Sequence, residues 1–273
     1  MGKFYNNTAN MNTEKNTLKK TIITFKEPES RLSYNVSSAV QGVLMENVSY
    51  GFGERMHENG SKPYSQHLVY ESSLPVWTIN TLSGEAEREL ADPLMKPECT
   101  QIYLRNKDMF LEIAGKSQSE IEFDELLQST FFAECSRYIK IRFRTPTAFK
   151  TNGRYQFYPT VRHIIKSLAG KFNACGFEAE IDLTDDIESM EENIDIADYS
   201  LRSTFFYLEG VRIPSFTGWV MLRIRGPQQL ANLMHLLVRF GEYSGVGIKT
   251  AMGMGAIEIE ERKEPVKHEK AKA

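Results

Sequence analysis

The second half of the chain carries the most regular pattern of hydrophobic and polar positions. Apolar residues recur at helical spacing in 159–173 and 226–241, and a proline stands at the start of each segment. The segment 149–159 contains an Asn-Gly pair between residues of strand type, which predicts a tight hairpin. Strands are predicted at 137–145, 201–210, 218–226 and 255–260. Apart from the hairpin, the order is strand, helix, two strands, helix, strand.

The first half shows a similar but less regular series. Its pattern predicts a strand, a helix, two strands, a helix and two strands, at 18–27, 35–51, 66–72, 75–80, 84–94, 100–105 and 108–115. The helix over 84–94 is disturbed near Pro93, and the polar segment 53–63 is typical of a loop. The order found in the second half is that of a ferredoxin-like unit (βαββαβ), which is also the plan of RNA-recognition (RRM-like) domains. We therefore expect an α+β protein.

Charge is distributed unevenly, although the 273 residues carry a net charge of only −3. From Cys135 to Phe177 there are nine Lys or Arg and no acid, whereas 178–198 contains ten acids and no Lys or Arg. Basic residues prevail again between Gly210 and Ile257. Such segregation builds either a positive surface for a polyanion or a solvated face that a neighbouring acidic segment balances. Charge alone leaves both interpretations open.

Composition argues against several classes of protein. The chain is 41% hydrophobic and 25% charged, which is typical of globular proteins, and no apolar run approaches the ~20 residues of a membrane span. The N-terminal sequence is polar and lacks the apolar stretch of a signal peptide. Cys99, Cys135 and Cys175 are far apart and odd in number, so we expect a reducing cytoplasm. The sequence HENG lacks the second histidine of a zinc helix, and neither a metal nor a cofactor is predicted.

A glycine-rich segment, GEYSGVGIKTAMGMG, lies between the helix at 226–241 and the strand at 255–260. A dinucleotide-binding loop has the reverse order, strand before helix, and the Walker Gly-Lys-Ser or Gly-Lys-Thr is missing. Glycines that end a helix or adopt positive φ account for one or two of those present. Their number indicates that the backbone approaches something closely.

In the glycine-rich segment and in two further stretches, the sequence resembles the CRISPR-associated endoribonucleases that process CRISPR precursor RNA. These enzymes form the sixth Cas protein family within the repeat-associated (RAMP) superfamily. The glycine-rich segment is similar to the family's C-terminal loop. RFRTPTAFKTNGRYQFYP with IIKSLAGKFN resembles the start of its second domain, and YNVSSAVQGVLMENV with MHENGSKPYS its first helix and the following loop. The resemblance implies two tandem ferredoxin-like domains, at 18–136 and 137–260. A disordered lead at 1–17 and a charged tail at 261–273 would flank them.

The resemblance also implies the catalytic residues. The family uses a histidine in the loop after the first helix as general acid or base and a nearby lysine as helper, which correspond here to His57 and Lys62. Some members add a tyrosine on the first helix, but that position is Met45 here, and Tyr50 or Tyr34 would have to replace it. The reaction would be metal-independent: the 2′-OH attacks the adjacent phosphate and leaves 2′,3′-cyclic phosphate and 5′-OH ends.

Binding is expected to rest on the second domain. The predicted RNA contacts are the glycine loop with its lysine and four basic residues of the strand and hairpin: Gly245, Gly247, Lys249, Gly253, Gly255, Arg142, Arg144, Lys150 and Arg154. The expected partner is CRISPR repeat RNA, with other Cas proteins as further candidates, in a monomer or homodimer. The alternative is a non-catalytic RAMP-type RNA-binding subunit of a CRISPR effector complex.

Overall fold

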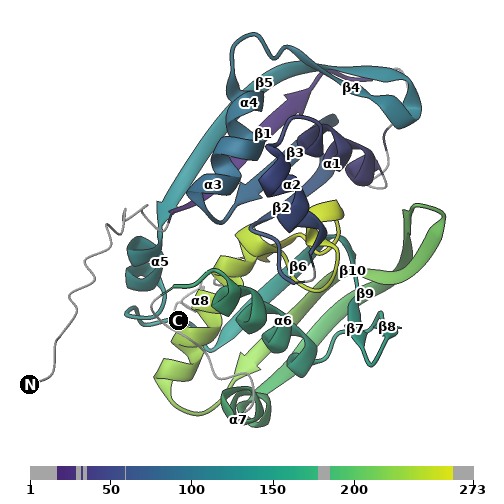
Figure 1. The fold of residues 1–273 in the computed structure, drawn as a ribbon. Coiled ribbons are helices and arrows are strands. Elements are labelled where there is room, and N and C mark those ends of the chain that lie inside the picture. Colours follow the sequence, from purple (N-terminus) through teal and green to yellow (C-terminus); the bar gives the residue numbers. More distant parts are fainter. Residues whose placement is uncertain (1–16, 29–31, 33–35, 59, 178–184, 261–273) are drawn as a thin grey trace, which may run out of the picture.

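The computed structural model describes residues 17–28, 32, 36–58, 60–177 and 185–260. The predicted lead, apart from Thr17, and the predicted tail lie outside the described residues, as does Tyr34. The described chain forms two α+β units, each built on an antiparallel sheet (Figure 1).

The second unit has the predicted ferredoxin-like topology. Its sheet has the strand order β11-β6-β10-β9, and every neighbouring pair is antiparallel. The six elements of the motif are β6 (Tyr138–Thr147), α6 (Val161–Ala174), β9 (Ile194–Leu208), β10 (Val211–Ile224), α8 (Gln228–Ser244) and β11 (Ile257–Glu260). The predicted Asn-Gly hairpin forms between β7 (Phe149–Thr151) and β8 (Arg154–Gln156). A further helix, α7 (Asp185–Asn193), covers part of the predicted acidic segment.

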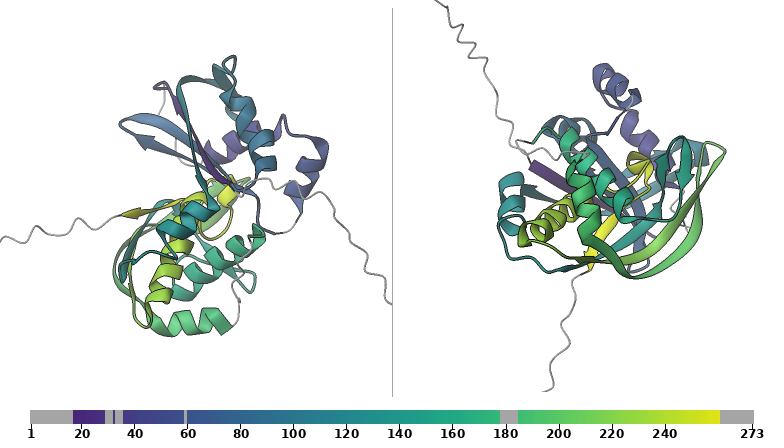
Figure 2. Two further views of the ribbon diagram at one scale, coloured as in Figure 1. Left: turned by 90° about the vertical axis from the view of Figure 1, so that its left-hand side faces the viewer. Right: turned by 90° about the horizontal axis from the view of Figure 1, so that it is seen from below.

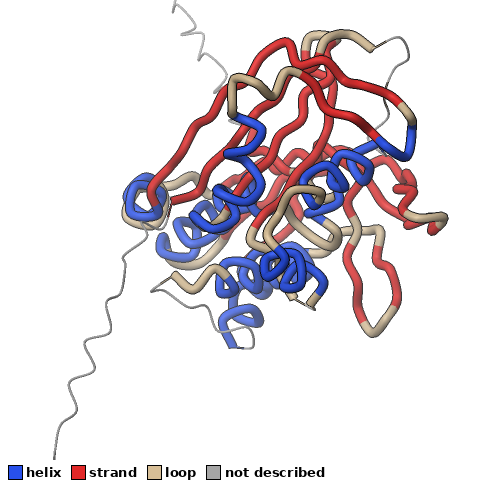
Figure 3. Tube along the Cα trace, turned by 45° about the horizontal axis from the view of Figure 1, so that its top comes forward, coloured by secondary structure: helices blue, strands red, loops and turns tan. Residues whose placement is uncertain are grey.

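The helices of this unit follow from their sequences. The side chain of Thr160 accepts a hydrogen bond from His163 N and so caps α6. Ile164, Leu168 and Phe172 then bury one face of α6 against the sheet and α8. The helices of the second unit gather on one side of its strands (Figure 3). Among the described residues, no helix covers the other face of this sheet.

The first unit repeats the plan with one added strand. Its sheet has the order β2-β3-β1-β5-β4, in which the first four strands give the ferredoxin-like arrangement and β4 extends the edge. Its elements are β1 (Thr17–Phe25), α1 (Ser37–Met45), α2 (Tyr50–His57), β2 (Tyr64–Glu71), β3 (Leu74–Thr81), α3 (Gly84–Ala86), the π-helical turn η2 (Glu87–Ala91), α4 (Asp92–Met95), β4 (Gln101–Leu104), the 3-10 turn η3 (Arg105–Lys107) and β5 (Met109–Glu122).

The structure corrects two local predictions in the first half, confirms the disturbance near Pro93 and adds one short helix. The helix predicted at 35–51 ends at Met45, and much of the predicted loop is instead α2. The helix around 84–94 forms but contains a π-helical turn just before Pro93, whose missing N–H and ring disturb the regular ladder. A short helix, α5 (Phe123–Ser129), was not predicted.

The two units share buried surface. Each sheet has its own hydrophobic core, but Phe123 and Leu126 of α5 pack in the core of the second unit. The domain boundary at 136/137 therefore stays a prediction. The glycine segment, coloured yellow, lies between the two units (Figures 1 and 2). Its Ala251 belongs to the core of the first unit.

Candidate functional site

The glycine segment is folded against its own protein. Gly245, Gly247, Gly253 and Gly255 all have positive φ. A Cβ at Gly247 would lie 2.3 Å from the carbonyl oxygen of Ala148, and a Cβ at Gly253 would lie 2.1 Å from Cβ of Ser37. These distances are too short for any side chain, so packing within the protein suffices to require glycine at both positions. The sequence predicted that the backbone of this segment approaches something closely, and in the structure its close neighbours are other residues of the same chain.

A buried polar cluster holds this segment on the first unit. Gln66 of β2 donates a hydrogen bond to the carbonyl of Ala251 (3.1 Å) and another to the carbonyl of Ser37 (2.8 Å). The indole N–H of Trp77 donates to the side-chain oxygen of Gln66 (2.9 Å), which fixes the amide. Because buried polar groups need partners, this cluster specifies one position of the segment relative to α1 and β2.

Lys249 is the residue of this segment that reaches solvent. Its neighbours from Ser244 to Ile257 are buried or half-buried, whereas Lys249 is exposed. It adopts the left-handed conformation (φ 57°), and its carbonyl accepts hydrogen bonds from Met252 N (2.9 Å) and Met254 N (3.3 Å). The fold therefore presents one cation on a fixed turn.

His57 ends a helix instead of lying in a loop. Ser49 caps the start of α2, and Glu89 accepts hydrogen bonds from the backbone and hydroxyl of Ser49 (2.7 Å each). Phe52 anchors the helix in the first core. The exposed His57 ring has no hydrogen-bond partner among the described residues. The sequence hid this helix because Gly51 and Gly53 are typical of loops, while a serine cap and one buried phenylalanine suffice to form it.

Lys62 lies between the end of α2 and the glycine segment. Its ammonium donates a hydrogen bond to the carbonyl of Glu58 (2.5 Å). Burial lowers the pKa of Lys62, the carboxylate of Glu58 opposes this, and the positive charge of Lys249 adds to the lowering. Two cations from different units thus lie close enough to repel each other. An anion placed between them would relieve that repulsion.

The tyrosine candidate lies at the far end of α2. Tyr50 is 81% exposed, and its hydroxyl donates to the carboxylate of Glu54 (2.6 Å). Seven residues of helix place it roughly 10 Å along the axis from His57. Met45, at the family's tyrosine position, packs against the first core.

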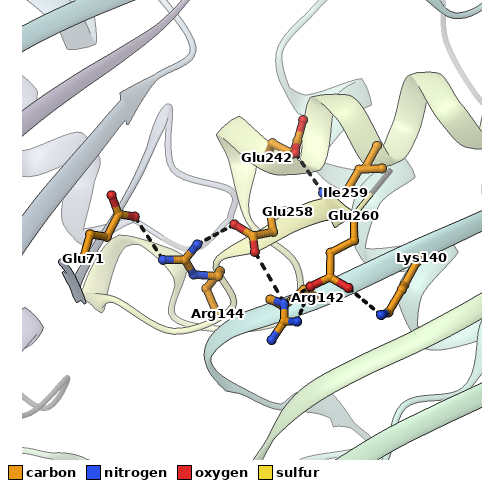
Figure 4. A network of polar contacts seen from close by, with 8 residues as sticks. All are labelled: Glu71, Lys140, Arg142, Arg144, Glu242, Glu258, Ile259 and Glu260. Atoms are coloured by element: carbon orange, nitrogen blue, oxygen red, sulfur yellow. Dashed lines mark hydrogen bonds and ion pairs between the residues drawn. The ribbon is translucent and has the colours of Figure 1, made fainter. Parts of the chain in front are cut away.

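The basic strand β6 is paired with acids. Glu258 and Glu260 of β11 stand opposite Arg142 and Lys140. Arg144 binds both Glu258 (2.5 Å) and Glu71 of the first unit (3.0 Å), and Glu260 binds Lys140 (2.6 Å) and Arg142 (Figure 4). Three cations thus face three carboxylates. The alternating Glu-Ile-Glu at 258–260 is a sequence signal for acids on one face of a strand. Only the strand register shows that these acids lie opposite Arg142 and Lys140.

The uncovered face of the second sheet nevertheless contains a groove. Its volume is about 910 Å³, and Arg142, Arg144, Arg202, Trp219, Glu258 and Glu260 line it. The other two predicted cations are elsewhere: Lys150 and Arg154 are exposed on the β7–β8 hairpin, and the ammonium of Lys150 lies 5.9 Å from the ring centre of Tyr155. The structure therefore separates the four predicted cations of the strand and hairpin into two groups, apart from Lys249 on the glycine turn.

Comparisons with known proteins identify the family. The model of the CRISPR-associated endoribonuclease Cas6 family matches residues 141–257. A CRISPR-associated endoribonuclease Cas6 of Mycobacterium tuberculosis is 30% identical over 224 residues, which cover 81% of this chain and 70% of that protein. The chain belongs to the Cas6 family. A Cas6 of Streptococcus thermophilus is 29% identical over 248 residues, which cover 90% of this chain and all of that protein.

Solved Cas6 structures share the fold. A Cas6 product complex is 21% identical with a TM-score of 0.75 and covers 90% of this chain and 100% of that chain. The Thermus thermophilus Cas6 is 20% identical with a TM-score of 0.69 and covers 90% and 99%. The predicted tandem ferredoxin-like architecture is confirmed. Within the described part of this Cas6 chain, His, Cys, Asp and Glu do not gather into a group of three that could hold a metal. The described helices are also too short or too polar to cross a membrane.

Proposed function

We propose that this Cas6-family protein cuts CRISPR precursor RNA once within each repeat, without a metal ion, to release guide RNA. The 2′-oxygen of one nucleotide attacks the adjacent phosphorus, and the bond from phosphorus to the 5′-oxygen breaks. The products are a 2′,3′-cyclic phosphate and a 5′-OH. Family membership and the related endoribonucleases support this activity.

The proposed roles of His57 and Lys62 rest on the family resemblance, and that of Lys249 rests on its nearness to Lys62. His57 takes the proton from the 2′-OH or gives one to the leaving 5′-oxygen, because imidazole titrates near neutral pH. Lys62 stabilises the negative charge that develops on the phosphate. Lys249 holds a phosphate beside it. The observation that carries this proposal is that Lys62 of the first unit and the exposed Lys249 of the second lie close enough for the charge of Lys249 to act on Lys62. Tyr50 remains a weaker candidate because of its distance along α2.

The other proposed RNA contacts all lie in the second unit. Gly245, Gly247, Gly253 and Gly255 shape the turn that presents Lys249, and the exposed Lys150 and Arg154 contact phosphates along the hairpin. Arg142 and Arg144 meet RNA at the groove, where a phosphate would have to compete with Glu258 and Glu260. The partner is the repeat RNA, and other Cas proteins of the cytoplasm would receive the product.

The first test removes the proposed proton-transfer group. His57→Ala is expected to slow single-turnover cleavage of a cognate repeat RNA in EDTA by about 10²–10⁴-fold, with RNA affinity retained. His235→Gln is the matched control, because it also removes an imidazole, but one on α8 of the second unit whose ring contacts the carbonyl of Ser136 (3.0 Å). If His57→Ala cuts at a near-wild-type rate, His57 has no catalytic role. Tight RNA binding without cleavage by the unmodified protein would instead favour a non-catalytic subunit.

The second test removes the proposed nucleophile. A repeat RNA with a 2′-deoxy substitution at the nucleotide on the 5′ side of the cut should bind with unchanged affinity and resist cleavage. The ends of the product from normal RNA should be a cyclic phosphate and a 5′-OH. Normal cleavage of the deoxy substrate would mean that water is the nucleophile, and the transesterification mechanism would then be wrong.

A further inference from the structure

Lys171 of α6 occupies an unusual position beneath the glycine segment. Its ammonium donates three hydrogen bonds of 3.1 Å each, to the carbonyls of Ser244 and Gly245 and to the hydroxyl of Thr250. An ammonium has three N–H groups, so every donor is used. No carboxylate among the described residues pairs with it. The half-buried Lys171 therefore directs its whole ammonium at the backbone and hydroxyl of the glycine segment.

The three acceptors come from the two ends of one turn. Ser244 is the last residue of α8, whose free carbonyls carry partial negative charge, so a cation is favourable there. Thr250 follows Lys249 directly in the chain. Lys171 therefore ties the helix end to the residue beside Lys249 and closes the turn from Gly245 to Thr250.

Two further contacts strengthen this arrangement. Ser167, one helical turn before Lys171, accepts a hydrogen bond from the backbone N–H of Gly247 (2.7 Å). A Cβ added at Gly245 would lie 2.7 Å from the methyl group of Thr250, so the two ends of the turn pack closely. Ser167 and Lys171 of α6 thus hold the turn at two points.

We propose that Lys171 is a positioning residue that fixes the turn so that Lys249 meets the RNA phosphate beside Lys62. This proposal rests on the proposed role of Lys249. Burial lowers the pKa of Lys171 to about 7. The thiol of Cys175, which follows the end of α6, lies near Lys171, but burial raises the pKa of this thiol to about 12, so it is neutral and carries no charge to pair with the ammonium. At pH 6 the ammonium therefore keeps all three donors.

The test compares Lys171→Met with Lys166→Met at pH 6. Lys166 is an exposed lysine on the same helix, so the substitution Lys166→Met removes an equal charge at a residue that does not contact the turn. Amide hydrogen exchange should become at least tenfold faster in peptides covering 245–255 of Lys171→Met, and unchanged in Lys166→Met and in peptides covering 64–81. Unchanged exchange of 245–255 in Lys171→Met would overturn the proposal.

RNA affinity separates positioning from general loss of structure. Lys171→Met should weaken RNA binding, and adding it to Lys249→Ala should cause no further loss, because Lys171 acts through Lys249. Fully additive losses would overturn the positioning role. If exchange becomes faster while Lys249→Ala itself leaves affinity unchanged, the proposed phosphate contact of Lys249 fails, whereas the anchoring of the turn by Lys171 stands.

Discussion

At the scale of single residues, the glycine segment has one exposed charge and a rigid support. The glycines meet the protein's own atoms, at Ala148 and Ser37, so their close approach does not by itself indicate RNA. Lys249 differs from them, because it is exposed and its charge acts on Lys62 across the two units. Recognition by this turn is therefore expected to be electrostatic and insensitive to base identity.

Lys249→Ala tests this expectation. The variant should bind repeat RNA and unrelated single-stranded RNA more weakly by a similar factor, because a phosphate contact carries no sequence information. The slope of log affinity against log salt should fall by about 0.7, the value for one phosphate contact in a single strand. Lys96→Ala, an exposed lysine after α4, is the control. A salt slope equal to that of the control would remove Lys249 from the phosphate-binding residues.

At the scale of elements, the second unit could be predicted from sequence and the site could not. The helices α6 and α8 each have a starting proline and an apolar stripe, and the Asn-Gly turn fixes the hairpin, so local rules suffice for them, whereas α7 has no such signal. The helix α2 depends on Ser49, Phe52 and a distant carboxylate, and such long-range anchoring leaves no periodic pattern. The pairing of Glu258 and Glu260 with β6 likewise required the strand register. The resemblance supplied His57 and Lys62, whereas the structure was needed to reveal Lys171.

The packing of the glycine turn on α1 gives a prediction at this scale. Gly253→Ala should lower the free energy of unfolding by about 2–4 kcal/mol, because the new Cβ would lie 2.1 Å from Cβ of Ser37 at a φ of +103°. Gly170→Ala is the matched control: no atom lies within 4 Å of its added Cβ, and it lies within α6. This control should raise stability by about 0.5–1 kcal/mol. Urea unfolding measures both, and equal effects would contradict the proposed contact.

At the scale of the whole molecule, the two units meet through polar groups as well as apolar ones. Ser65 donates a hydrogen bond to the carbonyl of Tyr243 (2.5 Å), and Glu71 binds Arg144 (3.0 Å) across the contact. His67 lies between them on the same strand, β2. Burial, Arg144 and Lys20 together lower its pKa to about 3, so this imidazole is neutral in the folded protein. An uncharged histidine therefore lies near Arg144 of the second unit.

This neutral histidine makes the joined structure sensitive to acid. The pKa of His67 is about 3 in the folded protein, whereas an unfolded histidine has its ordinary pKa near 6.5. Below pH 6.5 the unfolded chain therefore binds a proton at His67 that the folded chain does not bind. Stability from this group is complete above pH 6.5 and declines as the pH falls towards 3. Between pH 7.5 and 5.5 the wild type should lose about 1.4 kcal/mol more unfolding free energy than His67→Gln, which cannot take up that proton. Urea unfolding at both pH values measures the difference. The fluorescence of Trp77 follows the first unit and that of Trp219 the second, so the two signals show whether the units separate before either unfolds. Identical losses in the two proteins would mean that His67 is not held neutral between the units.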